Sequence, residues 1–242
     1  MNSMIIAYSF HQSSWFINFI SYMIMISYVI SCSSYRYKAW MYNLKGLKDK
    51  EFLWCGLLVF VTQYFISSGG YPVVLSLLFY VNKSLAMNLS HQSLISFTND
   101  SDWLFACLTI SFLVPIFEEL LFRGVILSRL SQRFSDFWSL ITMSLSFGLL
   151  HGVDFIGATV FGYLCGALYL KFKNIWASIL VHSLNNALGC LFFVINQNQK
   201  LSLPSFNEVE VLHSFKEGFS FLLIGGVFLV FTLKHLNQSR LE

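Results

Sequence analysis

Long, continuously apolar segments recur along the whole 242-residue chain. Charged residues interrupt these segments so rarely that most approach the roughly 20 residues that a helix needs to cross a bilayer core. Hydrophobic residues make up 56% of the sequence and charged residues only 11%, a composition too apolar for a soluble domain. The apolar runs are unbroken instead of alternating, which disfavours a β-barrel. The sequence therefore predicts an all-α fold, a polytopic bundle of membrane helices.

Eight segments are candidate transmembrane helices. They are Trp15–Cys32, Phe52–Ser68, Tyr71–Leu89, Trp103–Leu127, Phe137–Leu150, Asp154–Phe172, Ile175–Ile195 and Gly218–Leu233. The polar stretches Asn88–Asp102 and Asn196–Glu217 are predicted to be loops. Five cysteines, none in a CxxC pair, are predicted to be structural filler: Cys32, Cys55, Cys107, Cys165 and Cys190.

Basic residues fall in the short connections, where they indicate topology. The net charge of +3 is too small to suggest a nucleic-acid partner. Two spans separate each of the last three basic clusters, so all three can face the cytoplasm; they are Arg129 with Arg133, Lys171 with Lys173, and Lys234 with Arg240. The first cluster consists of Arg36, Lys38, Lys45, Lys48 and Lys50. Three candidate spans separate it from Arg129. Either residues 71–89, preceded by "SSGGYP", are re-entrant or interfacial, leaving seven spans, or the charge rule fails there.

The stretch "PIFEELLFRG", residues 115–124, places three charges inside an apolar segment. One charged side chain at the centre of a membrane helix costs about 2.5 to 3.5 kcal/mol on insertion scales. Glu119 and Arg123 are spaced at i and i+4, which predicts an ion pair on one helix face. Glu118 points about 100° away around the helix and has no partner in this spacing. An unpaired intramembrane carboxylate is a functional candidate.

Two further polar positions follow in "FGLLHG" and "HSLNNALG". With a rise of about 1.5 Å per residue from the helix ends nearest the basic loops, Glu118 lies about 13 Å deep, and His182 and Asn186 about 10 and 16 Å deep. His151 lies about 21 Å deep by the same estimate. The four side chains are therefore predicted to occupy one layer within the bilayer, reached from the cytoplasmic side.

These residues resemble a known family. "EELLFR" is similar to the EExxxR motif, "FGLLH" to the FxxxH motif, and "HSLNN" to the HxxxN motif of the CPBP group, the CAAX-protease and bacteriocin-processing intramembrane endopeptidases also called Abi. The three motifs occur in the same order, on three separate predicted helices, between about Trp103 and Leu191. The resemblance predicts a catalytic membrane core at residues 103–195. Residues 1–102 form N-terminal membrane helices without a motif, and 196–242 a polar loop followed by a membrane helix.

The resemblance implies a glutamate-type endopeptidase. Glu118 would be the general base that activates water, with His151 sharing that water. His182 and Asn186 would hold the developing oxyanion, and Glu119, Arg123 and Phe147 would support the site. A zinc-dependent version would use Glu118, His151 and His182 as ligands with water in the open position. The sequence has no HExxH arrangement and Asn186 is a poor zinc ligand, so a reaction without a cofactor is favoured.

Several alternatives stay open. The substrate would be a membrane-associated peptide: a prenylated CAAX tail, a signalling-peptide precursor or a bacteriocin leader. The same fold could instead provide bacteriocin immunity or membrane regulation by binding alone, whereas a transporter is disfavoured because the charges cluster in one layer and no repeat is visible.

Asp154 would either cap the following helix or orient His151. Gly162 and Gly166 form a G-x-x-x-G step that predicts close helix packing. A multi-pass protein of a bacterial plasma membrane is expected; the sequence indicates no oligomeric state.

Overall fold

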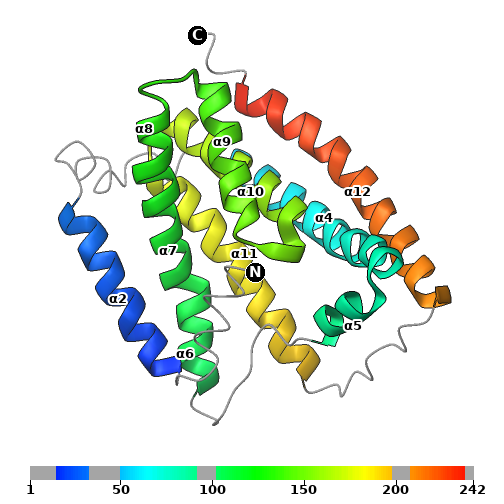
Figure 1. Ribbon diagram of the computed structural model, residues 1–242. Helices are drawn as coiled ribbons and strands as arrows, with labels where there is room; N and C mark the ends of the chain where they lie inside the picture. The colour runs from blue at the N-terminus through cyan, green and yellow to red at the C-terminus, as the bar shows by residue number, and fades with distance from the viewer. Residues whose placement is uncertain (1–14, 33–49, 92–101, 198–207, 238–242) are drawn as a thin grey trace.

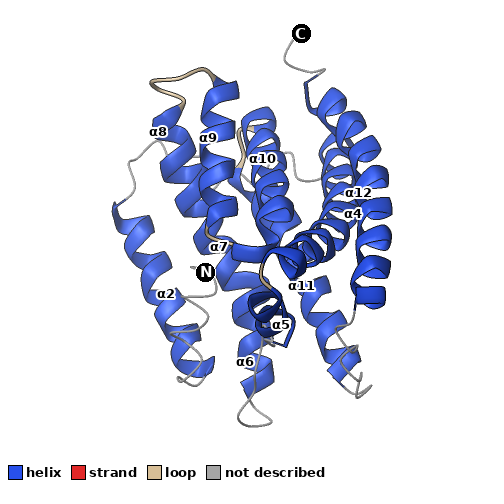
Figure 2. Ribbon diagram, turned by 45° about the vertical axis from the view of Figure 1, so that its right-hand side comes forward, coloured by secondary structure: helices blue, strands red, loops and turns tan. Residues whose placement is uncertain are grey.

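The computed structural model describes residues 15–32, 50–91, 102–197 and 208–237, and all regular secondary structure in these ranges is helical. Figures 1 and 2 show the helices gathered into one bundle. In chain order they are α2 (Trp15–Cys32), α4 (Lys50–Val81), α5 (Lys83–His91), α6 (Asp102–Leu108), the π-helix η1 (Thr109–Leu113), α7 (Val114–Glu119), the π-helix η2 (Leu120–Leu127), α8 (Ser128–Leu130), α9 (Asp136–Leu149), the 3₁₀ turn η3 (Gly152–Asp154), α10 (Phe155–Phe172), α11 (Ile175–Gln197) and α12 (Glu208–Asn237). The predicted polytopic, all-α bundle is confirmed.

Fewer helices are long enough to cross a membrane than the sequence predicted. Within the described residues, five are both long and apolar enough: Lys50–Val81, Trp103–Leu130, Gly152–Phe172, Ile175–Phe192 and Glu208–Asn237. Trp15–Ser31 is a shorter apolar helix. The predicted span Phe137–Leu150 is a helix of 14 residues, α9. At about 21 Å it is shorter than a hydrocarbon core of about 30 Å, so apolarity alone overestimated the number of complete crossings.

The predicted interruption at "SSGGYP" is wrong, because α4 continues through it for 32 residues. The glycines that suggested a break are instead a contact surface for α12. A Cβ atom on Gly69 would lie 2.5 Å from the backbone oxygen of Gly218, and one on Gly218 would lie 2.9 Å from the Pro72 ring. Thr62 and Thr232 add a hydrogen bond of 2.8 Å between the same two helices. Small residues therefore let α4 and α12 pack backbone to backbone.

This single helix removes the conflict over the basic clusters. Among the described residues between Lys50 and Arg129, two helical runs are long enough to cross a membrane, α4 and the run from α6 to α8, so both residues belong to the same end of the bundle. Lys171, near the end of α10, forms an ion pair of 2.7 Å with Glu51 at the start of α4 and donates a hydrogen bond to the His235 carbonyl. The first-cluster residues Arg36, Lys38, Lys45 and Lys48, and also Arg240, lie outside the described residues.

The C-terminal helix begins earlier than predicted, at Glu208 instead of Gly218. Two acidic residues in its first turn, Glu208 and Glu210, are favourable at the positive end of the helix dipole. Val211 is buried, and its carbonyl accepts a hydrogen bond of 3.2 Å from Ser76 of α4. Packing on α4 therefore extends the helix into a stretch whose polarity had indicated a loop.

Helices α9 and α10 form a hairpin, joined by His151 and the short turn η3. A Cβ atom on Gly166 would lie 2.6 Å from Leu140, and one on Gly162 would lie 3.3 Å from Phe147 and from Ser144. The G-x-x-x-G step thus packs α10 against α9, as predicted. This close packing also brings the backbone of Gly162 within reach of side chains on the preceding helices.

The glycine contact between α4 and α12 predicts a specific stability difference. Gly69→Ala is expected to destabilise the protein by about 1 to 3 kcal/mol, because the added methyl group meets backbone atoms that have little room to move. Gly226→Ala is the matched control, because no atom lies within 4 Å of its Cβ position. It should be neutral or stabilising by up to about 1 kcal/mol through helix propensity. Thermal unfolding in detergent measures both; equal midpoints for the two variants would contradict this packing.

Candidate active site

The site is built on a helical run, residues 102–130, that contains two π-helical segments. A π-turn interrupts the ladder of i to i+4 hydrogen bonds and so makes backbone carbonyls available to side chains. Both segments show this use. The Asn186 amide of α11 donates to the Ile110 carbonyl in η1 at 3.0 Å, and the Ser128 hydroxyl donates to the Arg123 carbonyl in η2 at 3.0 Å. Glu118 and Glu119 lie at the end of the short α-helix between the two segments.

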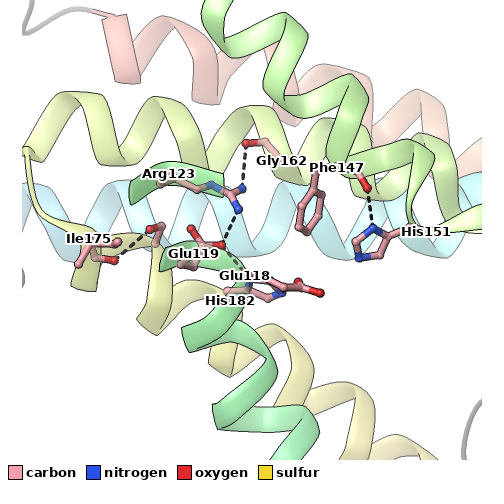
Figure 3. A network of polar contacts seen from close by, with 9 residues as sticks. Glu118, Glu119, Arg123, Phe147, His151, Gly162, Ile175 and His182 are labelled. Atoms are coloured by element: carbon pink, nitrogen blue, oxygen red, sulfur yellow. Dashed lines mark hydrogen bonds and ion pairs between the residues drawn. The ribbon is translucent and has the colours of Figure 1, made fainter. Parts of the chain in front are cut away.

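A buried ion pair anchors the site. Glu119 and Arg123 are both fully buried, and Arg123 Nη1 lies 2.8 Å from Glu119 Oε1. Arg123 Nη2 also donates to the Gly162 carbonyl of α10 at 3.0 Å, and the guanidinium lies 5.1 Å from the centre of the Phe147 ring of α9. Figure 3 shows Arg123 between these groups. The predicted i,i+4 pair is present, and it also joins the η2 segment to the α9–α10 hairpin.

His182 of α11 lies between the two glutamates. Its Nδ1 atom is 2.8 Å from Glu119 Oε1, and its Nε2 atom is 3.6 Å from Glu118 Oε2. The Phe161 and Phe147 rings meet the imidazole edge-on, with centroids 4.9 and 6.2 Å away. His182 is thereby fixed on both sides, and Glu118 and His182 are held next to each other as the depth estimate had suggested.

The hydrogen-bonding rules of these groups assign a proton. An ionised carboxylate only accepts, so the Nδ1 atom of His182 carries the hydrogen that reaches Glu119. A neutral imidazole would then present an Nε2 lone pair to the Glu118 carboxylate, leaving two acceptors 3.6 Å apart. A hydrogen on Nε2 would make His182 an imidazolium that faces Glu118 with a donor. The cluster then holds two carboxylates, Arg123 and one imidazolium, and its net charge is zero, which reduces the cost of burying it.

Glu118 differs from Glu119 in its surroundings. Its side chain is 17% exposed, and within the described part of the chain its Oε2 atom is buried without a hydrogen-bond partner. Glu119, by contrast, is fully buried and holds Arg123 and His182. The adjacent carboxylates thus differ in contacts and exposure: one oxygen of Glu119 holds both Arg123 and His182 in the interior, whereas Glu118 is partly exposed.

His151 follows α9 and is oriented by its own helix. Its Nδ1 atom lies 2.7 Å from the Phe147 carbonyl, which can only accept, so Nδ1 carries the hydrogen and Nε2 is an acceptor in the neutral ring. The His151 ring also packs on the Phe147 ring, with centroids 4.3 Å apart. Figure 3 shows the Phe147 ring between Arg123 and His151. The four-residue spacing of the FxxxH motif therefore gives His151 both its tautomer and its aromatic support.

Several neighbours of the site had no signal in the sequence. The Gly162 carbonyl and the Phe161 ring come from a helix that the sequence predicted only for packing. Tyr22 of α2 packs edge-on against Phe117 with centroids 5.8 Å apart, and its hydroxyl is within electrostatic reach of Glu118. The Ile110 carbonyl is exposed to Asn186 by a π-turn, which leaves no mark on amphipathic periodicity.

Asp154 differs from both of its predicted roles. It occupies the N-cap position of α10, but its side chain makes no capping hydrogen bond, and the His151 ring uses the Phe147 carbonyl instead of Asp154 for its orientation. Its Oδ1 atom is buried without a hydrogen-bond partner among the described residues. The position was predicted correctly, whereas the bond that usually explains an N-cap residue is missing.

The suggested zinc ligands do not come together as a set of three. Glu118 and His182 have suitable donor atoms. Among the residues that the structure describes, however, no group of three or more His, Cys, Asp or Glu side chains is close enough to hold a metal ion. The donor arrangement therefore does not fit the predicted zinc site of Glu118, His151 and His182.

Comparison with known proteins agrees with this geometry. Residues 100–188 match the family described as type II CAAX prenyl endopeptidase Rce1-like, and this range contains Glu118, Glu119, Arg123, His151, His182 and Asn186. This range is therefore similar to that endopeptidase family, in the part of the chain that holds the three sequence motifs. A Bacillus subtilis (strain 168) protein described as "Putative membrane peptidase YdiL" is 31% identical over 117 residues, which are 48% of this chain and 43% of that protein. This chain thus matches less than half of the length of its curated relative. No solved structure matches it.

The buried Glu119–Arg123 pair predicts a large penalty for breaking it. Arg123→Met should destabilise the protein by about 3 to 5 kcal/mol, because Glu119 would stay buried without its cation. The matched control is Glu51→Gln, which removes an ion pair whose carboxylate is 48% exposed and should cost less than about 1 kcal/mol. Unfolding in detergent, followed by circular dichroism, compares the two. A loss for Arg123→Met no larger than that for Glu51→Gln would show that the pair does not stabilise the core.

Proposed function

We propose that this protein is an intramembrane endopeptidase that uses Glu118 as its general base. The observation that carries the proposal is the open, buried Oε2 atom of Glu118, 3.6 Å from His182 and beside a fully buried Glu119–Arg123 pair. The family match and the peptidase relative support a peptide hydrolase. A protein that works only by binding has no need for a buried base opposite hydrogen-bond donors.

In the proposed reaction, Glu118 takes a proton from a water molecule, and the oxygen forms a bond to the carbonyl carbon of the peptide. His151, whose Nε2 atom is an acceptor in the neutral ring, accepts a second hydrogen bond from this water. Glu118 then passes its proton to the leaving amine as the carbon–nitrogen bond breaks. No serine or cysteine nucleophile takes part, because water attacks directly.

The oxyanion needs donors aimed at it. His182 supplies one, because Glu119 accepts from Nδ1 and stabilises the imidazolium, so that the Nε2 hydrogen is available to the substrate oxygen. Asn186 is the other proposed donor. Its amide nitrogen carries two hydrogens, and one of them is used by the Ile110 carbonyl. Asn186 would donate to the substrate oxyanion either with its second amide hydrogen or after moving away from the Ile110 carbonyl.

We further propose that the substrate is a membrane-associated peptide: a prenylated CAAX tail, a signalling-peptide precursor or a bacteriocin leader. The matched family is described as acting on CAAX prenyl proteins, which favours a lipidated peptide. We propose a bacterial plasma-membrane location, with the basic end of the bundle facing the cytoplasm. Lys50, Arg129 and Lys171 mark that end, from which the peptide would reach Glu118.

Glu118→Gln should abolish turnover without unfolding the protein. The amide keeps the shape of the side chain but cannot accept a proton from water, so cleavage of a fluorogenic, prenylated peptide in liposomes should fall by about 10²- to 10⁴-fold. The matched control is Glu208→Gln, at the exposed start of α12, which should cleave like the parent protein. The thermal midpoint of each variant checks that folding is intact.

The result separates catalysis from binding. Cleavage that persists in a folded Glu118→Gln variant would refute the general-base role. A protective or regulatory effect in cells that persists in this variant, without peptide cleavage by the parent protein, would indicate a binding function instead.

We propose that the reaction needs no metal ion, because the three candidate zinc ligands are not assembled. Protein purified without chelators should contain less than one zinc ion per chain, and cleavage should survive treatment with a strong chelator. Metal analysis and the peptide assay on the same sample test this. Stoichiometric zinc that is lost together with activity, and restored together with it, would overturn the proposal.

A further inference from the structure

Two cysteines lie on the two helical segments that carry the site. Cys107 is in α6, the beginning of the run that leads to Glu118, and Cys190 is in α11, two turns beyond His182. Both are free thiols, and Cys190 lies within electrostatic reach of Cys107. Cys190 is buried and Cys107 is half-buried. The sequence had predicted structural filler here, but a pair of neighbouring thiols has a chemistry that isolated buried cysteines lack.

Helix geometry independently places these thiols at nearly the same level of the bundle. The colours of Figure 1 show that α6 and α11 run in opposite directions. The hydrogen bond from Asn186 to the Ile110 carbonyl fixes their relative level. Cys107 precedes Ile110 by three residues, about 4.5 Å, and Cys190 follows Asn186 by four, about 6 Å. The two cysteines are therefore at nearly the same level, one turn beyond that hydrogen bond.

We propose that Cys107 and Cys190 form a disulfide bond that cross-links α6 to α11. In this step the two thiols lose two protons and two electrons to a disulfide oxidant, which is reduced to two thiols. Half-buried Cys107 reacts first and forms a mixed disulfide, and Cys190 displaces the oxidant's second thiol. The pair lies toward the end of the bundle opposite Lys171 and Arg129, the side that would face an oxidising exterior.

The cross-link would hold the site in the arrangement seen here. It joins the helical run of Glu118 and Glu119 to the helix of His182 and Asn186, next to the bond that commits Asn186 to Ile110. Asn186 would then be kept from moving toward a substrate oxyanion, so the oxidised protein should turn over more slowly than the reduced one. This effect on turnover rests on the proposed function; formation of the disulfide does not.

The test uses the purified full chain in liposomes, oxidised with the membrane-permeable disulfide dithiodipyridine. Non-reducing peptide mapping by mass spectrometry should find Cys107 linked to Cys190, and the thermal midpoint should rise by several degrees because the cross-link restricts the unfolded chain. Turnover should fall at least tenfold and recover with dithiothreitol. Cys107→Ala and Cys190→Ala should each abolish all three effects. The matched control is Cys165→Ala, another buried cysteine, which should retain them.

Each outcome decides the proposal. If the linked peptide is missing from oxidised parent protein, the disulfide is refuted, whatever the activity. If the link forms but neither the midpoint nor turnover changes, the cross-link does not hold the helices and the proposal is overturned. If the untreated protein shows no turnover at all, the proposed peptidase function fails, while the linked peptide and the rise in midpoint still support the cross-link.

Discussion

The buried Glu119–Arg123 ion pair is the interaction on which the rest of the core depends. Two opposite charges in an apolar interior are costly unless they are paired, and further contacts of each group reduce the cost. Arg123 also donates to the Gly162 carbonyl and lies on the Phe147 ring, and Glu119 also accepts from His182. The pair therefore fixes the positions of three other segments, α9, α10 and α11, around the η2 segment.

This arrangement explains how two neighbouring glutamates can differ in function. Glu119 neutralises Arg123 and orients His182, both through its Oε1 atom. Glu118 lies one position earlier, on another helix face, and its Oε2 atom is 3.6 Å from the Nε2 atom of His182. The structural pair thus creates the environment in which the proposed base is available to water.

The sequence predicted much of this local chemistry, and the reasons are physical. Charges are so costly in apolar segments that Glu118, Glu119 and Arg123 stood out, and the i,i+4 spacing correctly predicted the ion pair. The G-x-x-x-G step predicted close packing, and small residues do allow α10 to approach α9. The same logic failed at "SSGGYP", because glycine and proline indicate both a chain break and a close contact. Only the neighbouring α12 decides between these.

The sequence by itself determined the fold class and the ion pair and supplied the residues proposed for catalysis, because apolarity, charge and helical spacing are local properties. Tertiary structure alone decided that α4 is one helix, that His182 lies between two glutamates, and that the Asn186 amide is bonded to Ile110. These depend on which helices meet and at what level. The π-turn at η1 and the proximity of Cys107 and Cys190 belong to the same group, since neither leaves a periodic signal in the sequence.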